Sequence, residues 1–165
     1  MHLTVSNVAV VACLLGFAGL LWWLEDAGLN ERGGPAQVID GDSLLIGGER
    51  VRLKSIDAPE GRQMCQKNGS AWRCGRAASK ALQELVRGKE VICEGQELDR
   101  YDRLLAYCRV GAVDLNRTLV RQGWAVAFGD RYFSEERAAQ ARRVGLWQGS
   151  FQRPAAWRAQ QRGLR

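Results

Sequence analysis

The stretch VIDGDSLLIGGERVRL, residues 38–53, decides the fold. Branched apolar residues alternate with polar ones on both sides of Gly47 and Gly48, a composition typical of two short strands joined by a tight turn. The DGD sequence at residues 40–42 interrupts an apolar run in the same way and indicates an earlier turn. We therefore expect a small, twisted β-meander over residues 37–57.

The pattern changes downstream of this meander. Apolar residues recur at helical spacing over residues 77–86, and Gly88 follows where a helix should end. Residues 90–94 and 104–110 alternate as strands do, and the polar residues 97–103 would join them into a hairpin. Two more helices are expected, at residues 114–122 and 134–144, the second opened by Ser134 with acidic residues in its first turn.

The N-terminal part differs in character from the rest. An apolar run at residues 8–24 contains no charge and would extend about 26 Å as a helix, near the lower limit for crossing a bilayer. We expect residues 1–25 to be a membrane segment that binds the lipid bilayer and leaves the domain outside. A cleaved signal peptide and a buried helix are the alternatives. The small pair Gly16 and Ala18 lies inside the run, so cleavage there would leave apolar residues exposed.

The remaining chain divides by composition. Residues 26–35 are polar and Gly-rich, which predicts a flexible linker. Residues 36–150 contain all the strand and helix signals and form the expected domain. Residues 151–165 are rich in Arg, Gln and Ala and predict a basic tail that is frayed or loosely helical.

Four of the five cysteines lie in the expected domain. Cys93 and Cys108 would face each other across the predicted hairpin, and Cys65 and Cys74 bound a loop before the first helix. No pair has the close spacing of a structural zinc site. We expect two disulfides and an extracytoplasmic domain, membrane-anchored, or secreted if the N-terminal segment is removed.

The charge balance points to a class of partner. The formal net charge is +6 at pH 7, which favours a polyanion such as nucleic acid. A soluble basic surface and attraction to anionic lipid would give the same balance. The charge alone supports a nucleic-acid partner without selecting it. No obligate protein partner is evident from the sequence.

Acidic residues gather where the meander turns. Asp40 and Asp42 flank one turn, and Asp57 and Glu60 follow the next strand. Clustered carboxylates repel one another unless a cation lies between them, and oxygen ligands suit calcium better than zinc. Ordinary Asx turns would explain each pair separately.

These acids occur together with Arg52 and with the segment DRYDR at residues 99–103. In order and spacing, the runs at residues 38–43, 51–60, 99–107 and 115–125 resemble the staphylococcal nuclease family. The resemblance covers nearly all of residues 36–147.

The resemblance implies a calcium site. Asp42 and Asp57 would bind calcium through their carboxylates, and Ala58 through its carbonyl oxygen. Asp40 would support the ion through bound water. Ala58 replaces the family's usual threonine and keeps that carbonyl.

The resemblance also implies roles in catalysis. Arg52 and Arg103 would grip the scissile phosphate, because a guanidinium offers a charged planar fork to phosphate oxygens. Glu60 would activate or orient the attacking water. Substrate contacts are expected from Arg100, Tyr101 and Tyr132. In addition, Ser43 stands for a threonine of the family.

One departure from the family pattern bears on substrate binding. Asp102 stands where the family has glycine, and its negative charge lies beside Arg103. This charge should weaken the affinity for phosphate.

Pattern and resemblance together predict an α+β domain that is mainly β-barrel. We expect a five-stranded Greek-key barrel of the OB type with three helices, one N-terminal hydrophobic helix and no parallel strand pair. The implied activity is that of a calcium-dependent endonuclease, with exonuclease ability, that hydrolyses DNA and/or RNA to 3'-phosphorylated products. A non-catalytic, membrane-tethered OB-fold module that binds nucleic acid is the alternative, and an interaction domain at the cell envelope is a weaker one.

Overall fold

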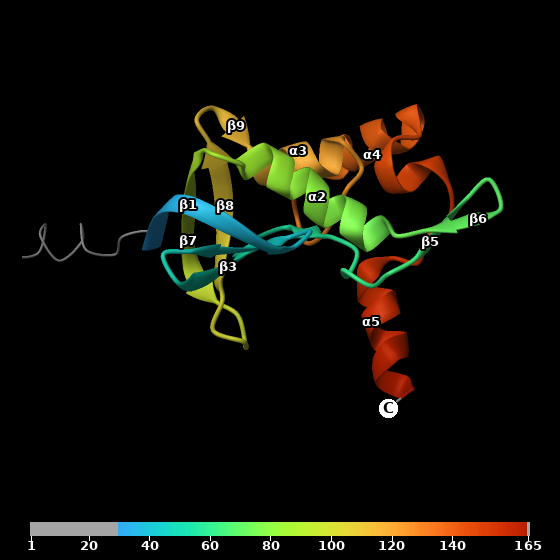
Figure 1. Cartoon of the computed structure of the whole chain (residues 1–165), viewed down its shortest axis with the longest axis horizontal. Coiled ribbons are helices and arrows are strands. Elements are labelled where there is room, and N and C mark those ends of the chain that lie inside the picture. Colours follow the sequence, from blue (N-terminus) through green and yellow to red (C-terminus); the bar gives the residue numbers. More distant parts are fainter. Residues whose placement is uncertain (1–29, 165) are drawn as a thin grey trace, which may run out of the picture.

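The computed structural model describes residues 30–164, and five of its strands form a barrel (Figure 1). These strands are β1 (Asn30–Asp40), β2 (Ser43–Ile46), β3 (Glu49–Leu53), β7 (Glu90–Leu98) and β8 (Leu104–Val110). β1 pairs antiparallel with both β2 and β7, and β7 pairs antiparallel with β8. The five-stranded barrel and the meander at its start confirm that part of the predicted fold.

The pair that closes the barrel is parallel, so the expectation of antiparallel pairs alone is wrong. Val51 of β3 lies opposite Leu104 of β8, and the two strands run in the same direction. The reason is the connection between them. A helix carries the chain across the barrel after β3, and β7 then returns it so that β8 starts at the same end as β3.

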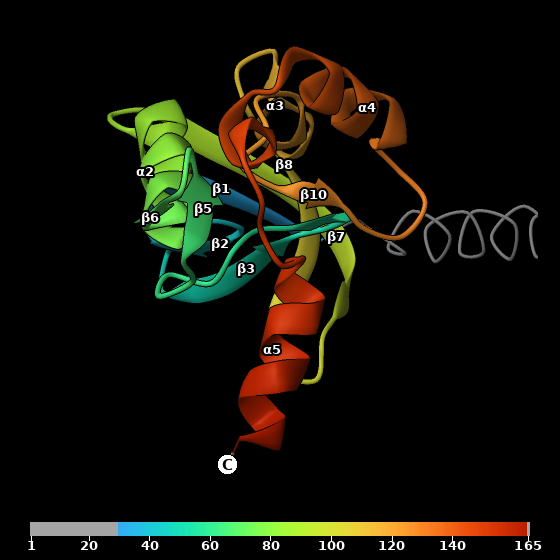
Figure 2. The ribbon, with the colours of Figure 1, turned by 90° about the vertical axis from the view of Figure 1, so that its right-hand side faces the viewer.

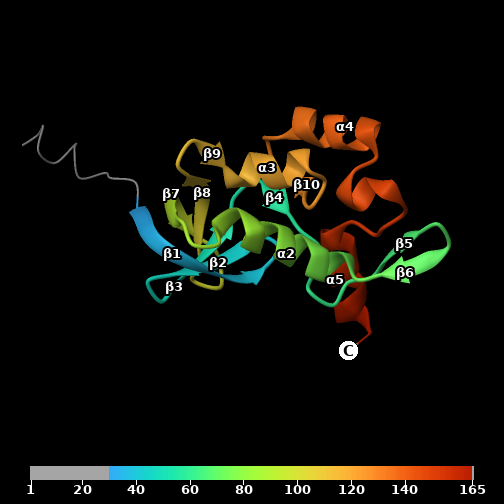
Figure 3. The ribbon, with the colours of Figure 1, turned by 45° about the horizontal axis from the view of Figure 1, so that its top comes forward.

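Five short strands complete the β-structure. β4 (Ile56–Asp57) pairs with β10 (Val126–Ala127), and β9 (Val113–Asp114) pairs antiparallel with the end of β8. β5 (Cys65–Lys67) and β6 (Ser70–Trp72) form a hairpin that projects beside the first helix of the domain (Figure 3). The loop between Glu60 and that helix is therefore an ordered hairpin.

Four α-helices and one 3-10 turn are present in residues 30–164. They are α2 (Cys74–Val86), α3 (Leu115–Arg121), α4 (Phe133–Arg142), the 3-10 turn Gly145–Gln148, and α5 (Pro154–Gly163). The first three confirm the expected helices, although α4 begins one residue before Ser134. The fourth corrects the expectation of three: the tail is a helix with proline at its first position, which suits a helix start.

The core lies between the barrel and the helices α2 and α3. Ala78, Leu82 and Val86 lie four residues apart on α2, and all three are buried. They pack with barrel residues such as Leu44 and Val51 in one apolar cluster. α2 thereby covers one end of the barrel and fixes the strand turns beneath it.

Both expected disulfides are present. One joins Cys93 and Cys108, which lie opposite each other on β7 and β8. The other joins Cys65 on β5 to Cys74 at the start of α2. Such disulfides are typical of proteins outside the cytoplasm.

The N-terminal boundary differs from the expected linker at residues 26–35. β1 already begins at Asn30, and residues 30–35 pair with β7 from Gly95 to Glu90. The polar sequence becomes a strand because β7 offers unpaired backbone groups along that edge. The expected membrane segment at residues 1–25 lies outside the described residues. Within residues 30–164, no helix is long and apolar enough to cross a membrane.

Candidate active site

The acidic turn at the start of the site joins β1 to β2. The side chain of Asp40 accepts a hydrogen bond from the backbone N–H of Asp42 at 3.2 Å. A Cβ at Gly41 would lie 2.8 Å from the Cβ of Ala58 and 2.9 Å from that of Ala78. Only glycine fits there, so the turn packs closely against α2 and against the segment after β4.

Asp42 points into the protein and is only 3 % exposed. Its carboxylate accepts hydrogen bonds from Arg52 at 2.9 Å, from the Ser43 hydroxyl at 3.1 Å and from the Ala58 backbone N–H at 3.0 Å. Burial raises the pKa of Asp42 to about 7; Arg52 opposes this shift, and the neighbouring Asp40 adds to it. A proton and a cation would therefore compete for this carboxylate near neutral pH.

Arg52 connects the two buried acids. It lies on β3 opposite Ser43, a register that places its side chain next to the acidic turn. One of its nitrogens donates to Asp42, and the other donates to Asp57 Oδ1 at 3.0 Å. Buried carboxylates need such partners, and Arg52 supplies the positive charge that both require.

The Asp42 and Asp57 carboxylates and the Ala58 carbonyl are hard oxygen donors, which fits a calcium ion. No group of three or more His, Cys, Asp or Glu side chains converges in the described part of the chain. Arginines hold these carboxylates instead: Arg52 donates to Oδ1 of Asp42 and of Asp57, and Arg158 donates to both oxygens of Asp57. The second oxygen of Asp42 accepts from the Ala58 backbone N–H. These oxygen atoms are of the kind that calcium prefers, and guanidinium groups supply the positive charge beside them.

Arg158 also lines the site, although no motif in the sequence marks it. It reaches from α5 and donates to both oxygens of Asp57, at 2.9 and 3.0 Å, and to Glu60 Oε1 at 3.0 Å. Burial alone would lower the pKa of Arg158, but these bonds to Asp57 and Glu60 raise it above its ordinary value. A signal for its helix was present, because Pro154 is a favourable start for a helix and the residues after it lack helix breakers.

The β7–β8 hairpin tip supplies the second predicted arginine. Arg103 donates twice to Asp99 Oδ2, at 2.8 and 2.6 Å. Burial would raise the pKa of Asp99, but hydrogen bonds from Arg103 and from the Tyr101 backbone hold it below the usual range. Arg100 and Arg103 both lie over the ring of Tyr101. Asp102 adopts a left-handed φ of 57°, which explains why glycine suits this position.

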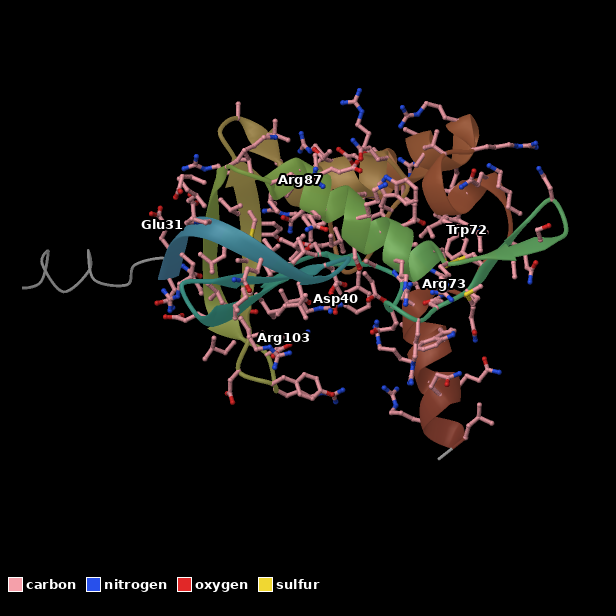
Figure 4. All side chains as sticks on the ribbon, in the orientation of Figure 1. Glu31, Asp40, Trp72, Arg73, Arg87 and Arg103 are labelled. Atoms are coloured by element: carbon pink, nitrogen blue, oxygen red, sulfur yellow. A yellow bond between two sulfur atoms is a disulfide. The ribbon has the colours of Figure 1, made fainter. Side chains whose placement is uncertain are left out.

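These elements enclose one cleft of about 530 Å³, called here the active-site cleft. The β7–β8 loop and α5 project from the same side of the barrel (Figures 1 and 2), and Figure 4 shows Arg103 and Asp40 on that side. The lining residues are Asp40, Arg52, Glu60, Asp99, Arg100, Tyr101, Arg103, Phe128, Arg158 and Arg162. The structure thus brings all three predicted catalytic side chains to one place.

Tyr132 is not brought to the cleft, contrary to the expectation. It is 7 % exposed, belongs to the core cluster, and its hydroxyl lies 3.3 Å from Asp114 Oδ2. Phe128, four residues earlier, is 58 % exposed and lines the cleft instead. Gly129 and Tyr132 both have a positive φ, so the chain turns between the two rings.

Comparison with known proteins agrees with the geometry. A family model described as staphylococcal nuclease homologue matches residues 50–149. The succinoglycan biosynthesis protein ExoI of Rhizobium meliloti (strain 1021) is 39 % identical, over 84 % of this chain and 73 % of its own. An uncharacterized endonuclease of Haemophilus influenzae is 33 % identical, over 76 % and 72 %.

A third relative carries the name of an enzyme. The micrococcal nuclease of Shigella flexneri is 31 % identical, over 77 % of this chain and 80 % of its own. The family match covers more than half of this chain and includes Arg52, Asp57, Glu60 and Arg103. This chain belongs to the staphylococcal nuclease homologue family.

Proposed function

We propose that the chain is a calcium-dependent nuclease that hydrolyses phosphodiester bonds of DNA and/or RNA to 3'-phosphorylated products. The observation that carries this proposal is the convergence of Arg52, Glu60 and Arg103 on one cleft beside two buried aspartates. Binding alone does not need that combination, whereas phosphoryl transfer needs charge stabilisation and a base together. Relatives named as nucleases and endonucleases support the same reaction.

Calcium fits the acidic end of the cleft. The carboxylates of Asp42 and Asp57 and the carbonyl of Ala58 would hold the ion, with Asp40 acting through water. Bound there, calcium would supply positive charge to a phosphoryl oxygen. Asp42 must be deprotonated to take part, so its raised pKa couples metal binding to pH.

The two arginines would stabilise the charge that develops on the phosphate. Arg52 is paired with Asp42 and Asp57, and Arg103 is paired with Asp99. A phosphate bound in the cleft would replace these carboxylates as the partner of each guanidinium and would accept two hydrogen bonds from it. Both side chains are largely buried, which strengthens their field at the reacting atoms.

Glu60 is placed to act on water. Arg158 holds one of its oxygens, Oε1, and Oε2 accepts no hydrogen bond from the described residues. Glu60 Oε2 can therefore take a proton from a water molecule while the side chain stays oriented. We assign Glu60 the role of general base and Arg158 that of positioning it.

The setting outside the cytoplasm belongs to the same proposal. We propose that residues 1–25 tether the enzyme to a membrane with its domain on the outer side. The two disulfides support the outer location.

The deciding experiment is a cleavage assay on the full chain in detergent. Single-stranded DNA, duplex DNA and RNA are each incubated with calcium or with chelator, for the wild type and for Glu60→Ala and Arg103→Ala. Arg109→Ala, which removes an exposed arginine of β8, is the matched control. We expect calcium-dependent cutting that falls at least a hundredfold in both site variants and is unchanged in the control.

A different result would select the alternative function. If the wild type binds these substrates but cuts none of them with any divalent ion, the domain is a nucleic-acid-binding module. In that case the carboxylates would serve structure alone.

A further inference from the structure

A second cleft of about 700 Å³ runs beside the N-terminal half of α2. Four cations form its rim: Arg62, Arg73, Arg76 and Lys80. Two apolar side chains, Ile39 and Met64, line the same space, and each is 48 % exposed. We call this cleft the α2 groove.

The positive charge of the α2 groove is not neutralised locally. Within residues 30–164, Arg62, Arg73 and Arg76 form no ion pair with a carboxylate, and Lys80 only a weak one, at 3.8 Å to exposed Glu84. The first turn of α2 contains no acidic residue. Like charges held this close repel one another, so the arrangement favours an anion between them.

The apolar residues indicate what kind of anion fits. An isolated phosphate would need only the cations. Exposed Ile39 and Met64 in the same cleft as these cations suit a strand whose backbone is anionic and whose bases have apolar faces. This is the chemistry of a nucleic-acid strand with accessible bases.

The α2 groove is continuous with the active-site cleft. It shares Gly61 and Arg62 with a smaller cleft beside α5, and that cleft shares Glu60 and Arg158 with the active-site cleft. Ile39 of the α2 groove also directly precedes Asp40 of the active-site cleft. A strand bound at the proposed scissile position can therefore pass Glu60 and enter the α2 groove.

The Cys65–Cys74 disulfide fixes the shape of the α2 groove. Met64 precedes the first cysteine and Arg73 precedes the second, and the two Cα atoms of the disulfide lie 5.7 Å apart. The disulfide thus joins the segments that carry apolar Met64 and cationic Arg73. A binding surface held in this way loses little conformational entropy when it takes up a ligand.

From these observations we propose that the α2 groove is a second binding subsite for the phosphodiester backbone, some nucleotides away from the bond that is cut. The proposal rests on the proposed nuclease function for the identity of the strand. The subsite would raise the affinity for long substrates, because a short substrate fills the active-site cleft without reaching Arg73 or Arg76.

The test compares two charge reversals on the same helix in the full chain in detergent. The groove variant is Arg73→Glu with Arg76→Glu. The control is Arg87→Glu with Lys89→Glu at the far end of α2; Figure 4 shows Arg73 and Arg87 at opposite ends of the helix. The probes are fluorescein-labelled oligothymidylates of two and twelve nucleotides.

We expect the groove variant to raise the KM for the twelve-nucleotide probe at least tenfold, with kcat nearly unchanged and the two-nucleotide probe cut normally. Binding of the groove variant to the long probe is also followed by anisotropy in chelator. The slope of log K against log salt concentration should become less steep by about one to two, as expected for two lost phosphate contacts. The control variant should match the wild type in every assay.

Other outcomes separate the two proposals. Equal loss on both probes, or equal loss in the control variant, would overturn the α2 groove as a subsite. If the groove variant loses binding to phosphatidylglycerol vesicles but keeps its oligonucleotide binding, the α2 groove is a lipid-binding surface and the subsite is overturned. If the wild type cuts neither probe yet binds the long one through the α2 groove, the nuclease function fails and the subsite stands.

Discussion

At the scale of single residues, Asp42 combines burial with a charge that the proposed chemistry needs. Its pKa is raised to about 7, mainly by burial, against an ordinary value of 3.8. Between about pH 4 and pH 7, Asp42 is therefore protonated in the folded protein and deprotonated in the unfolded chain. Stability from this group is greatest at low pH and falls as pH rises through that window.

Replacing Asp42 by asparagine should reverse this penalty in the metal-free protein. We expect Asp42→Asn to raise the free energy of unfolding at pH 8 by roughly 1–3 kcal/mol, since each unit of pKa shift corresponds to about 1.4 kcal/mol and Arg52 loses a partner. At pH 5 the gain should be much smaller. Urea unfolding in chelator measures both values, and equal destabilisation at the two pH values would contradict the argument.

The same residue predicts how calcium binding depends on pH. Because a proton and the ion compete for Asp42, the calcium Kd should rise as pH falls below about 7, by up to tenfold per unit. Isothermal titration at pH 8 and pH 6 tests this in the full chain. A Kd that is constant across this range would show that Asp42 is not a ligand.

At the scale of elements, the start of α2 holds the loop that carries Glu60. A Cβ at Gly75 would overlap the carbonyl oxygen of Glu60, so helix and loop touch directly at this point. We expect Gly75→Ala to push the loop away and lower kcat at least tenfold, with a smaller change in the calcium Kd. Gly33→Ala, where a Cβ meets nothing within 4 Å, is the control. Unchanged kcat in Gly75→Ala would refute this role of α2.

Elements whose sequence has its own strand or helix periodicity could be predicted. Elements that form only against a partner far away in the sequence could not. The meander, the β7–β8 hairpin and three helices follow local alternation or helical spacing. Residues 30–35 form a strand only because β7 has a free edge beside them. The tail, expected to be frayed or loosely helical, is an ordered helix whose start is held by contacts from Gln63 and Glu136. Pro154 indicates the start of the helix that carries Arg158, but not the role of Arg158, because its partner Asp57 lies 101 residues away in sequence. Local pattern likewise does not distinguish exposed Phe128 from buried Tyr132.

At the scale of the whole molecule, the C-terminal helix closes on acids from the first half of the domain. Its approach is fixed by Arg153 against Glu136, by Gln63 donating to the Gln152 carbonyl at 2.6 Å, and by Arg62 over the ring of Trp157. The family match ends at residue 149, before this helix begins. α5 therefore adds a cation to the site from outside the matched region.

That cation and calcium should compete. Arg158 occupies both oxygens of Asp57, so a metal ion can use this carboxylate fully only when the guanidinium moves away. We expect Arg158→Ala to lower the calcium Kd by about tenfold, a gain of roughly 1.4 kcal/mol. Arg162→Ala, which removes a charge from the same helix without touching Asp57, should leave the Kd within about twofold. Calcium titration of the full chain distinguishes the two, and weaker binding in Arg158→Ala would mean that Arg158 assembles the metal site instead of opposing it.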